Sequence, residues 1–147
     1  MSAAGLGSWP SGWISSSDNS GVIHNHRFVK LKGGRFQLCE CALGERCIGV
    51  VNDGSKLPPM DANEATINVT ESAGQSVPGV IPPGQVALVE VGVGGLTLND
   101  LVTSDETGRA INSVGGYADQ GDVVNGIALH DALEGELAYI LVWPQVL

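Results

Sequence analysis

Residues 136–143, ELAYILVW, and residues 85–93, QVALVEVGV, decide the fold class of this chain. Both stretches are rich in β-branched, aromatic and other large apolar side chains, and neither carries a helical period. Side chains along a strand point alternately to its two faces, and here both faces are apolar apart from Gln85, Glu90 and Glu136. An antiparallel sheet normally leaves one face to water, so these strands need a second cover. We expect either another subunit or the chain's own loops and N-terminal arm to supply it.

Seven further segments have the pattern of short strands, bounded by Gly, Pro, Asn and Asp residues that favour turns. We predict strands at 27–32, 35–41, 46–51, 65–70, 101–104, 109–114 and 122–129. Gly33-Gly34 supplies a two-residue hairpin turn between the first two, and residues 72–84 are expected to form an irregular loop. Nine short strands without a long helix indicate an antiparallel barrel or sandwich.

The composition agrees with a β fold. Gly and Pro together make up 28 of the 147 residues, Val and Ile make up 25, and only 16% are charged. A chain of this length is typical of one domain, and its hydrophobic content of 43% is enough to support a core. We therefore predict one all-β domain over residues 27–147.

Residues 1–26 differ in character from the rest and are predicted to form an extended N-terminal arm. They are rich in Gly and Ser and contain Trp9 and Trp13, between which Pro10-Ser11-Gly12 opposes a helix. A polar segment gains little from Trp9, Trp13 and Ile14 unless they dock on a surface. That surface is either the chain's own body or a partner, because tryptophan is a frequent anchor of interfaces.

The charge is unevenly distributed. Sixteen carboxylates against seven Lys and Arg give a net charge of −9, which argues against a whole-chain nucleic-acid binder because phosphate contact needs positive surface. Residues 1–56 carry six basic residues and four acids, net +2, whereas residues 57–147 carry only Arg109 against twelve acids, net −11. Self-association that places the N-terminal part of one copy on the acidic body of another is one use of this asymmetry.

Four basic residues form a run with no acid between them: Arg27, Lys30, Lys32 and Arg35. Strand alternation places Lys30 and Lys32 on one side of the predicted hairpin. Ordinary solvation is the default interpretation of this run. Contact with an acidic surface of another subunit comes next, and nucleic acid comes last.

One cluster of soft metal ligands is present: His24, His26, Cys39, Cys41 and Cys47. Its spacing matches no zinc finger or ribbon, so free thiols and surface histidines are the preferred interpretation. Within the predicted strand 35–41, the cysteines fall on the more polar face. Three cysteines cannot form a closed set of disulfides, and an odd number fits a reducing compartment.

The sequence carries no evident catalytic motif and no targeting segment. Serine lies in no nucleophile motif, and adjacent His130 and Asp131 would point to opposite faces of a strand. The longest apolar stretch, residues 137–143, is far shorter than the ~20 residues that cross a bilayer. We therefore predict no enzymatic activity, no cofactor, no metal and no membrane partner, and expect the chain to be made in a cytosol.

Residues 86–109, VALVEVGVGGLTLNDLVTSDETGR, followed by residues 125–129, NGIAL, and residues 135–142, GELAYILV, resemble the capsid decoration (cement) proteins of tailed bacteriophages. The pattern of that family has a strand, then G-D-x-V-x-x-D-x-x-G-r-a, and then G-x-A-l-x-x-a-x-x-G-e-x-v-x-V. Residues 99–102, NDLV, fill the first slot with Asn99 where glycine is usual, and Asp105 with Gly108-Arg109-Ala110 fills the turn. The arm and the long loops within 52–84 depart from the compact family pattern.

The resemblance implies a small antiparallel β-barrel or β-tulip-like domain bound to the outside of a capsid. The implied partners are the major capsid protein and further copies of the chain, as a homo-trimer or alternatively a dimer, with no nucleic acid and no membrane. Such a protein is made in the bacterial host cytoplasm, is located on the capsid exterior of the virion, and stabilises the shell. The expected contact residues are Trp9, Trp13, Ile14, Arg27, Lys30, Lys32 and Arg35.

The alternative from a different class is a metal-dependent β-barrel enzyme or ligand-binding module. It would use His24, His26 and the three cysteines.

Overall fold

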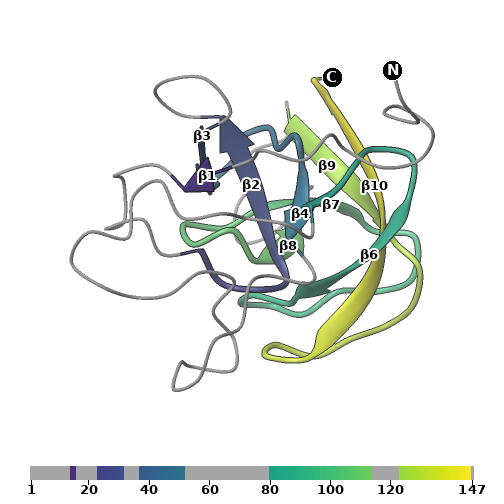
Figure 1. The fold of residues 1–147 in the computed structure, drawn as a ribbon. Coiled ribbons are helices and arrows are strands. Elements are labelled where there is room, and N and C mark those ends of the chain that lie inside the picture. Colours follow the sequence, from purple (N-terminus) through teal and green to yellow (C-terminus); the bar gives the residue numbers. More distant parts are fainter. Residues whose placement is uncertain (1–13, 16–22, 32–36, 52–79, 114–122, 147) are drawn as a thin grey trace.

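The structure, a computed structural model, describes residues 14–15, 23–31, 37–51, 80–113 and 123–146 (Figure 1). These residues form ten strands and no helix, which confirms the all-β class. In the described part of the chain, therefore, no helix is long and apolar enough to cross a membrane. The predicted strand at 65–70 and most of the predicted arm lie outside the described residues.

The first sheet has five strands in the order β1-β3-β2-β4-β5. Their bounds are β1 Ile14–Ser15, β2 Arg27–Leu31, β3 Gln37–Glu40, β4 Gly49–Val51 and β5 Val80–Ile81. β1 pairs with β3 in parallel, and the other neighbours are antiparallel. The central pair places Phe28 of β2 opposite Val50 of β4, so that both side chains point to the same face.

The second sheet has five antiparallel strands in the order β6-β10-β9-β7-β8. Their bounds are β6 Val86–Glu90, β7 Leu101–Ser104, β8 Ala110–Asn112, β9 Val123–Ala128 and β10 Leu137–Val146. The register between β10 and β9 shifts between Val142 and Gln145, where Pro144 has no N–H to donate to the ladder. Gly126 lies opposite Val142, where a Cβ atom would collide with the Leu141 carbonyl oxygen.

The two edges of the second sheet approach each other. Val91, directly after β6, forms an isolated parallel bridge with Ala110 of β8, and the Gly92 N–H donates to the Ala110 carbonyl at 2.8 Å. Between the two sheets, single backbone bonds run from Phe28 N to Gly108 O and from Glu90 N to His26 O. The described strands therefore form two packed sheets joined by isolated bonds, rather than the closed barrel that the resemblance implied. The sandwich interpretation is the one that fits.

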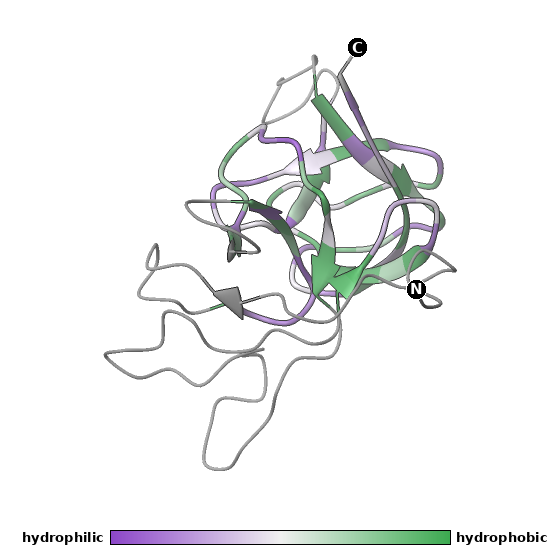
Figure 2. Cartoon of the chain, turned by 45° about the horizontal axis from the view of Figure 1, so that its top comes forward, coloured by the Kyte–Doolittle hydropathy of each residue, from purple (hydrophilic) through white to green (hydrophobic). Residues whose placement is uncertain are grey.

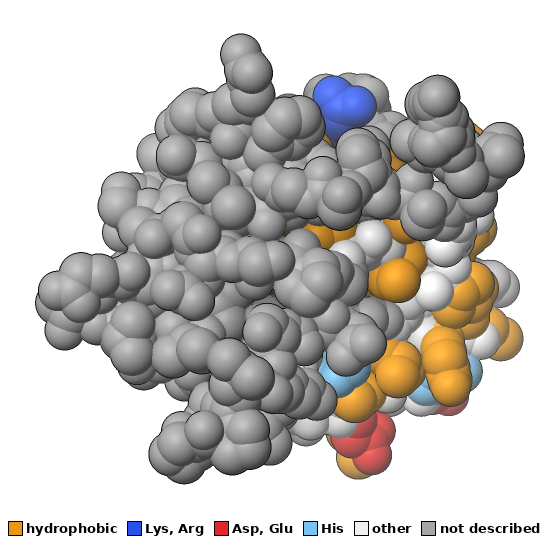
Figure 3. Space-filling view, in the orientation of Figure 1, with side chains coloured by type: hydrophobic (Ala, Val, Ile, Leu, Met, Phe, Trp, Pro, Cys, Tyr) orange, Lys and Arg blue, Asp and Glu red, His pale blue; other side chains and the backbone are white. Residues whose placement is uncertain are grey.

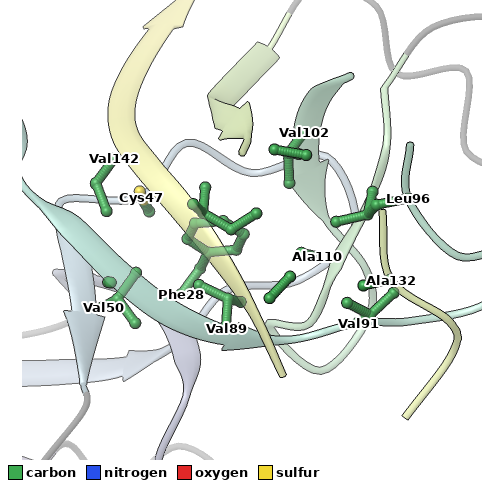
Figure 4. Close-up of a cluster of buried hydrophobic side chains, with 14 of the residues drawn as sticks. Phe28, Cys47, Val50, Val89, Val91, Leu96, Val102, Ala110, Ala132 and Val142 are labelled. Atoms are coloured by element: carbon green, nitrogen blue, oxygen red, sulfur yellow. The ribbon is translucent and has the colours of Figure 1, made fainter. Parts of the chain in front are cut away.

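The main core lies between the sheets (Figure 4). On the side of the first sheet it contains Phe28 of β2, Val50 of β4, and Cys41 and Cys47 of the loop between β3 and β4. Its members from the second sheet include Val89, Val102, Ala128, Ile140 and Val142. Figure 4 shows the side chains of both sheets gathered around the Phe28 ring. A second cluster, on the opposite face of the first sheet, consists of Ile23, Val29, Leu38, Val51 and Val80. The first sheet is therefore buried on both faces.

The cysteines are not on a polar face, so that prediction is wrong. Cys39, Cys41 and Cys47 are all buried, and the last two belong to the core between the sheets. The prediction rested on Arg35 and Gln37, which share a face with the cysteines in the alternation of residues 35–41. In the structure Lys30 is opposite Cys39, and its ammonium pairs with Glu45, which leaves the thiols to pack inward.

The strand predictions hold to within a few residues wherever the structure describes them. Residues 101–104 form β7 as predicted, and β9 and β10 fall on the predicted 122–129 and 136–143, with β10 extended to Val146. Within the predicted loop 72–84, Val80–Ile81 form a short strand. A segment of two residues is too short to show an alternating pattern in the sequence. Val80 and Ile81 are a strand because they pair with β4.

Candidate interaction surface

One face of the second sheet is apolar and open. Along β10, the side chains of Ala138, Ile140 and Val142 point into the core and have 0% exposure. The alternate side chains point outward, and Tyr139 and Trp143 are each 53% exposed. Strand alternation therefore gives β10 one dry face and one apolar face in contact with solvent.

The apolar surface continues onto both neighbours of β10. Leu88 of β6 lies opposite Tyr139, while Val86 of β6 and Ile127 of β9 lie on the two sides of Leu141. We call the combined surface the outer face. It consists of Val86, Leu88, Ile127, Leu129, Leu137, Tyr139, Leu141 and Trp143.

Figure 3 shows hydrophobic side chains gathered on the side where β6 and β10 lie in Figure 1. In Figure 2 much of the hydrophobic colour lies on the strands, and much of the hydrophilic colour on their connections. A contiguous exposed apolar patch on a folded domain is typical of an interaction site.

Glu90 is the one acid of the described residues in register with the outer face, and two arginines neutralise it. Glu90, opposite Leu137, accepts a hydrogen bond from Arg27 Nη2 at 3.2 Å, and its other oxygen lies 3.7 Å from Arg109 Nη1. Arg27 also donates from Nη1 to the Thr107 carbonyl at 3.0 Å. These contacts join β2, β6 and the turn between β7 and β8, so the ion pairs clamp the two sheets together at one end of the outer face.

Asp105 organises the turn that supplies Arg109. Its carboxylate accepts the backbone N–H groups of Thr107 and Arg109, each at 2.8 Å, and Arg109 Nε at 2.9 Å. Burial alone would lower the pKa of Arg109, but the hydrogen bond and charge of Asp105, with the charge of Glu90, outweigh it and raise that pKa. Arg109 thus stays charged beside Glu90. The turn predicted at Asp105 to Gly108 is built by this carboxylate.

His130 supports the edge of the outer face. Its Nε2 accepts the backbone N–H of Tyr139 at 3.0 Å, so the ring proton is assigned to Nδ1, which donates to the Asp131 carbonyl at 2.8 Å. The two rings form an edge-to-face contact with centroids 5.8 Å apart. The Asp131 carboxylate instead accepts the Leu98 N–H at 2.8 Å. His130 and Asp131 therefore form no acid–base pair.

Three of the seven predicted contact residues, Ile14, Arg27 and Lys30, lie in the described part of the chain. Trp9, Trp13, Lys32 and Arg35 lie outside the described residues, and Ile14 is in β1 at the edge of the first sheet. Arg27 holds Glu90, and Lys30 Nζ lies 2.5 Å from Glu45 Oε1. Burial alone would lower the pKa of Lys30, but Glu45 outweighs it and raises that pKa. Arg27 and Lys30, the two basic residues of the predicted contact set that the structure describes, are thus already paired within the chain.

The predicted soft ligands are used separately. His24 Nδ1 lies 2.8 Å from Glu40 Oε2, whose oxygen also accepts the His24 backbone N–H at 2.7 Å. His26 Nδ1 lies 3.2 Å from the Leu88 carbonyl oxygen. Burial raises the pKa of the Cys47 thiol to about 12 and that of Cys41 well above its ordinary value. Among the residues that the structure describes, no group of three or more such side chains could hold a metal ion.

A shallow hollow of about 360 Å³ lies between the turn at residues 94–97 and the turn at residues 131–136. Its two carboxylates are occupied by backbone groups, since Asp131 accepts the Leu98 N–H and Glu136 accepts the Leu133 N–H at 2.7 Å. These acids shape turns, and they leave the outer face as the most distinctive surface of the described residues.

Comparison with known proteins gives a likeness of fold. No protein-family model matches the sequence, and no curated protein matches it. Among solved structures, the chain is similar to the crystal structure of the head fiber gp8.5 N base of bacteriophage phi29. The TM-score is 0.59, with 16% identity, and the match covers 92% of this chain and 93% of that chain. The likeness spans nearly the whole of both chains and concerns the fold.

Proposed function

We propose that this chain is a structural protein of a bacteriophage virion, bound to the outside of the capsid. The observation that carries the proposal is its likeness in fold, over 92% of its length, to the base of a phage head fiber. The pattern of residues 86–142 supports the same class independently, because it resembles the capsid decoration proteins of tailed phages. Both comparisons point to proteins attached to phage heads.

The chemistry of the described residues fits a protein that assembles. Polar side chains such as Asp105, Asn125 and Glu136 bind backbone groups of turns and loops. The surface feature that stands apart is the outer face, which is apolar and therefore suited to contact with protein. Nothing in the described residues favours the alternative of a metal-dependent enzyme, because the predicted ligands are bound elsewhere or buried as thiols.

Attachment to coat protein is assigned to the N-terminal part of the chain. Trp9, Trp13 and Ile14 are the apolar anchors of this contact, and the basic run supplies its positive charge. Arg27 and Lys30 already have acidic partners within the chain, so the intermolecular charge comes chiefly from Lys32 and Arg35. The complex cements the shell because each copy bridges coat subunits and adds buried apolar area to the assembled particle.

The chain is made in the host cytoplasm and joins the virion as a homo-oligomer, a trimer or a dimer. A phage head presents many equivalent sites, and symmetric homo-oligomers match such an arrangement.

The location is tested on virions of the phage whose genome encodes the chain. Immunogold electron microscopy with an antibody against the chain is expected to label the outside of intact heads. Absence of the chain from purified virions, or labelling confined to disrupted particles, would contradict the proposal. Heating particles with and without the chain then tests cementing, and DNA release is expected at a lower temperature without it.

The attachment residues are tested in the full-length chain. Replacing both tryptophans, Trp9→Ala with Trp13→Ala, is expected to lower capsid occupancy about ten-fold or more, because tryptophan anchors carry much of an interface's affinity. The control is Leu43→Ala, an exposed leucine in the loop before β4. Equal occupancy for wild type and the double variant would reject the role of the tryptophans and leave the location on the virion standing.

A further inference from the structure

We infer that the outer face is the surface through which copies of this chain pack against one another, outer face to outer face. The inference rests on the proposed function for its setting, a virion part present in many copies. Its observations are the exposed apolar face of β10, β6 and β9, the neutralised acid beside it, and the net charge of the chain.

The first argument is the size of the patch. Val86, Leu129, Leu137, Tyr139 and Trp143 are between 40% and 53% exposed. With roughly 150–250 Å² for each large side chain, these five expose on the order of 400 Å² of largely apolar surface. The partly buried Leu88, Ile127 and Leu141 add to it. An interface of standard size buries about 800 Å² per partner, of which a little over half is apolar, so the outer face supplies the apolar core of one such interface.

The second argument is charge, and it indicates that the partner on the outer face is a second copy of the chain. Two copies of a chain with a net charge of −9 repel each other wherever their acidic surfaces meet. Copies associate most readily through a surface that carries no unbalanced charge on either partner. The outer face meets this condition because Glu90 is held by Arg27 and Arg109. A surface of this kind is complementary to itself, as contacts between identical subunits require.

The third argument is rigidity. Three adjacent strands support the outer face through backbone pairing, which is regular up to the register shift between Val142 and Gln145. Tyr139 is held further by the edge-to-face contact of its ring with His130 and by its backbone bond to the same histidine. A preformed apolar surface loses little conformational entropy on association, which favours a specific contact.

The test uses the full-length chain alone, by sedimentation velocity over a range of concentrations. Wild-type chain is expected to show reversible association. Tyr139→Glu places a carboxylate at the centre of the outer face and is expected to weaken association about 30-fold or more, the effect of losing an interface hot spot. The matched control is Leu31→Glu, because Leu31 is 52% exposed and lies in β2 of the other sheet. This control is expected to associate like wild type.

A second pair of variants asks whether like faces meet. Tyr139→Glu and Tyr139→Lys are each expected to be monomeric, and their equimolar mixture is expected to regain association because opposite charges then meet. Unfolding curves of each variant confirm that it is folded. A monomeric wild type at about 100 μM, equal weakening by Leu31→Glu, or a mixture that stays monomeric would each overturn the inference. Since no capsid is present, those outcomes leave the virion proposal to be decided by the labelling experiment.

Discussion

The inner and outer faces of β10 consist of neighbouring residues with similar hydrophobicity, yet they have opposite surroundings. Ile140 and Val142 lie in the core between the sheets, where they contact both layers. Tyr139 and Trp143, one position away, are about half exposed. Burial of apolar area stabilises the fold only on the inner face. The outer face adds little to the stability of a single chain, and its apolar area can still be buried when chains associate.

The first sheet differs from β10 because the chain covers both of its faces. Phe28 and Val50 point to the core between the sheets, while Val29 and Val51 point to the second cluster on the opposite side. The chain therefore covers both faces of the first sheet, but it covers only the inner face of the second sheet at β10. We therefore expect the first sheet and the inner face of β10 to contribute most of the folding stability, and the outer face to make the contacts between molecules.

The largest test of this division is Ile140→Ala. Removing a fully buried isoleucine leaves a cavity, and we expect a loss of about 2–5 kcal/mol in the free energy of unfolding. Tyr139→Ala, on the outer face of the same strand, is expected to cost less than about 1 kcal/mol in dilute monomer. Urea unfolding measures both. Similar losses for the two variants would show that the faces do not differ as the structure describes.

The second prediction concerns how the loop before β4 is attached to β9 of the second sheet. Asn125, which is fully buried, accepts the Cys47 N–H and donates to the Glu45 carbonyl, both at 2.9 Å. Asn125→Leu leaves two backbone groups without partners, and we expect a loss of about 2–3 kcal/mol. Hydrogen exchange gives a local measurement, because the Cys47 amide should lose protection more than the amides of β10. Unchanged protection at Cys47 would contradict the proposed attachment.

The third prediction uses the thiols of the inner core. Burial raises the pKa of Cys47 from an ordinary 9.0 to about 12, so the folded chain binds this proton more tightly than the unfolded chain. The stabilisation is fully present below pH 9 and is lost as the pH rises from 9 toward 12. We expect stability to fall by roughly 1.4 kcal/mol for each pH unit in this window from Cys47 alone.

Cys47→Ala separates this effect from other alkaline titrations. The variant is expected to be less stable at pH 8 but to show a shallower decline above pH 9, measured by urea unfolding at several pH values. An unchanged slope would mean that Cys47 is not the group responsible.

The smallest effect is expected at the ion pairs beside the outer face. Glu90→Gln removes the charge that holds Arg27 and Arg109, and we expect a loss of about 1 kcal/mol in stability, because the pairs are only partly buried. The same change leaves Arg27 without its charged partner near the outer face, whereas Arg109 keeps Asp105, and it should weaken association at low salt more than at high salt. If the loss of association did not depend on salt, the charge balance around Glu90 would have no role in association.

Local patterns account for the success of the strand predictions. Alternation and turn residues are read within a few positions, which is why Leu101–Ser104 and most of β9 and β10 were predicted close to their true bounds. The same local reasoning showed that β10 is apolar on both faces. It placed the cysteines wrongly, because the polarity of their face was judged from Arg35 and Gln37 of the same predicted strand, and alternation within one strand does not show whether another sheet covers that face.

Contacts between distant segments could not be predicted from one sequence. Arg27 and Glu90 are 63 positions apart, and Asn125 binds the loop at Glu45 and Cys47 from about 80 positions away. No short-range pattern encodes such pairs, since they depend on how the two sheets pack. The basic run therefore looked available for a partner although two of its members are paired internally.

By itself the sequence determined the all-β class, the positions of most strands and the double apolar character of β10, because side-chain periodicity and turn chemistry are local properties of the chain. Only the tertiary structure decided which face of β10 became core and which remained open. Ala138, Ile140 and Val142 face the first sheet, and the bulkier Tyr139 and Trp143 do not. That choice depends on the packing of two sheets whose strands lie far apart in the sequence, so no local pattern could contain it.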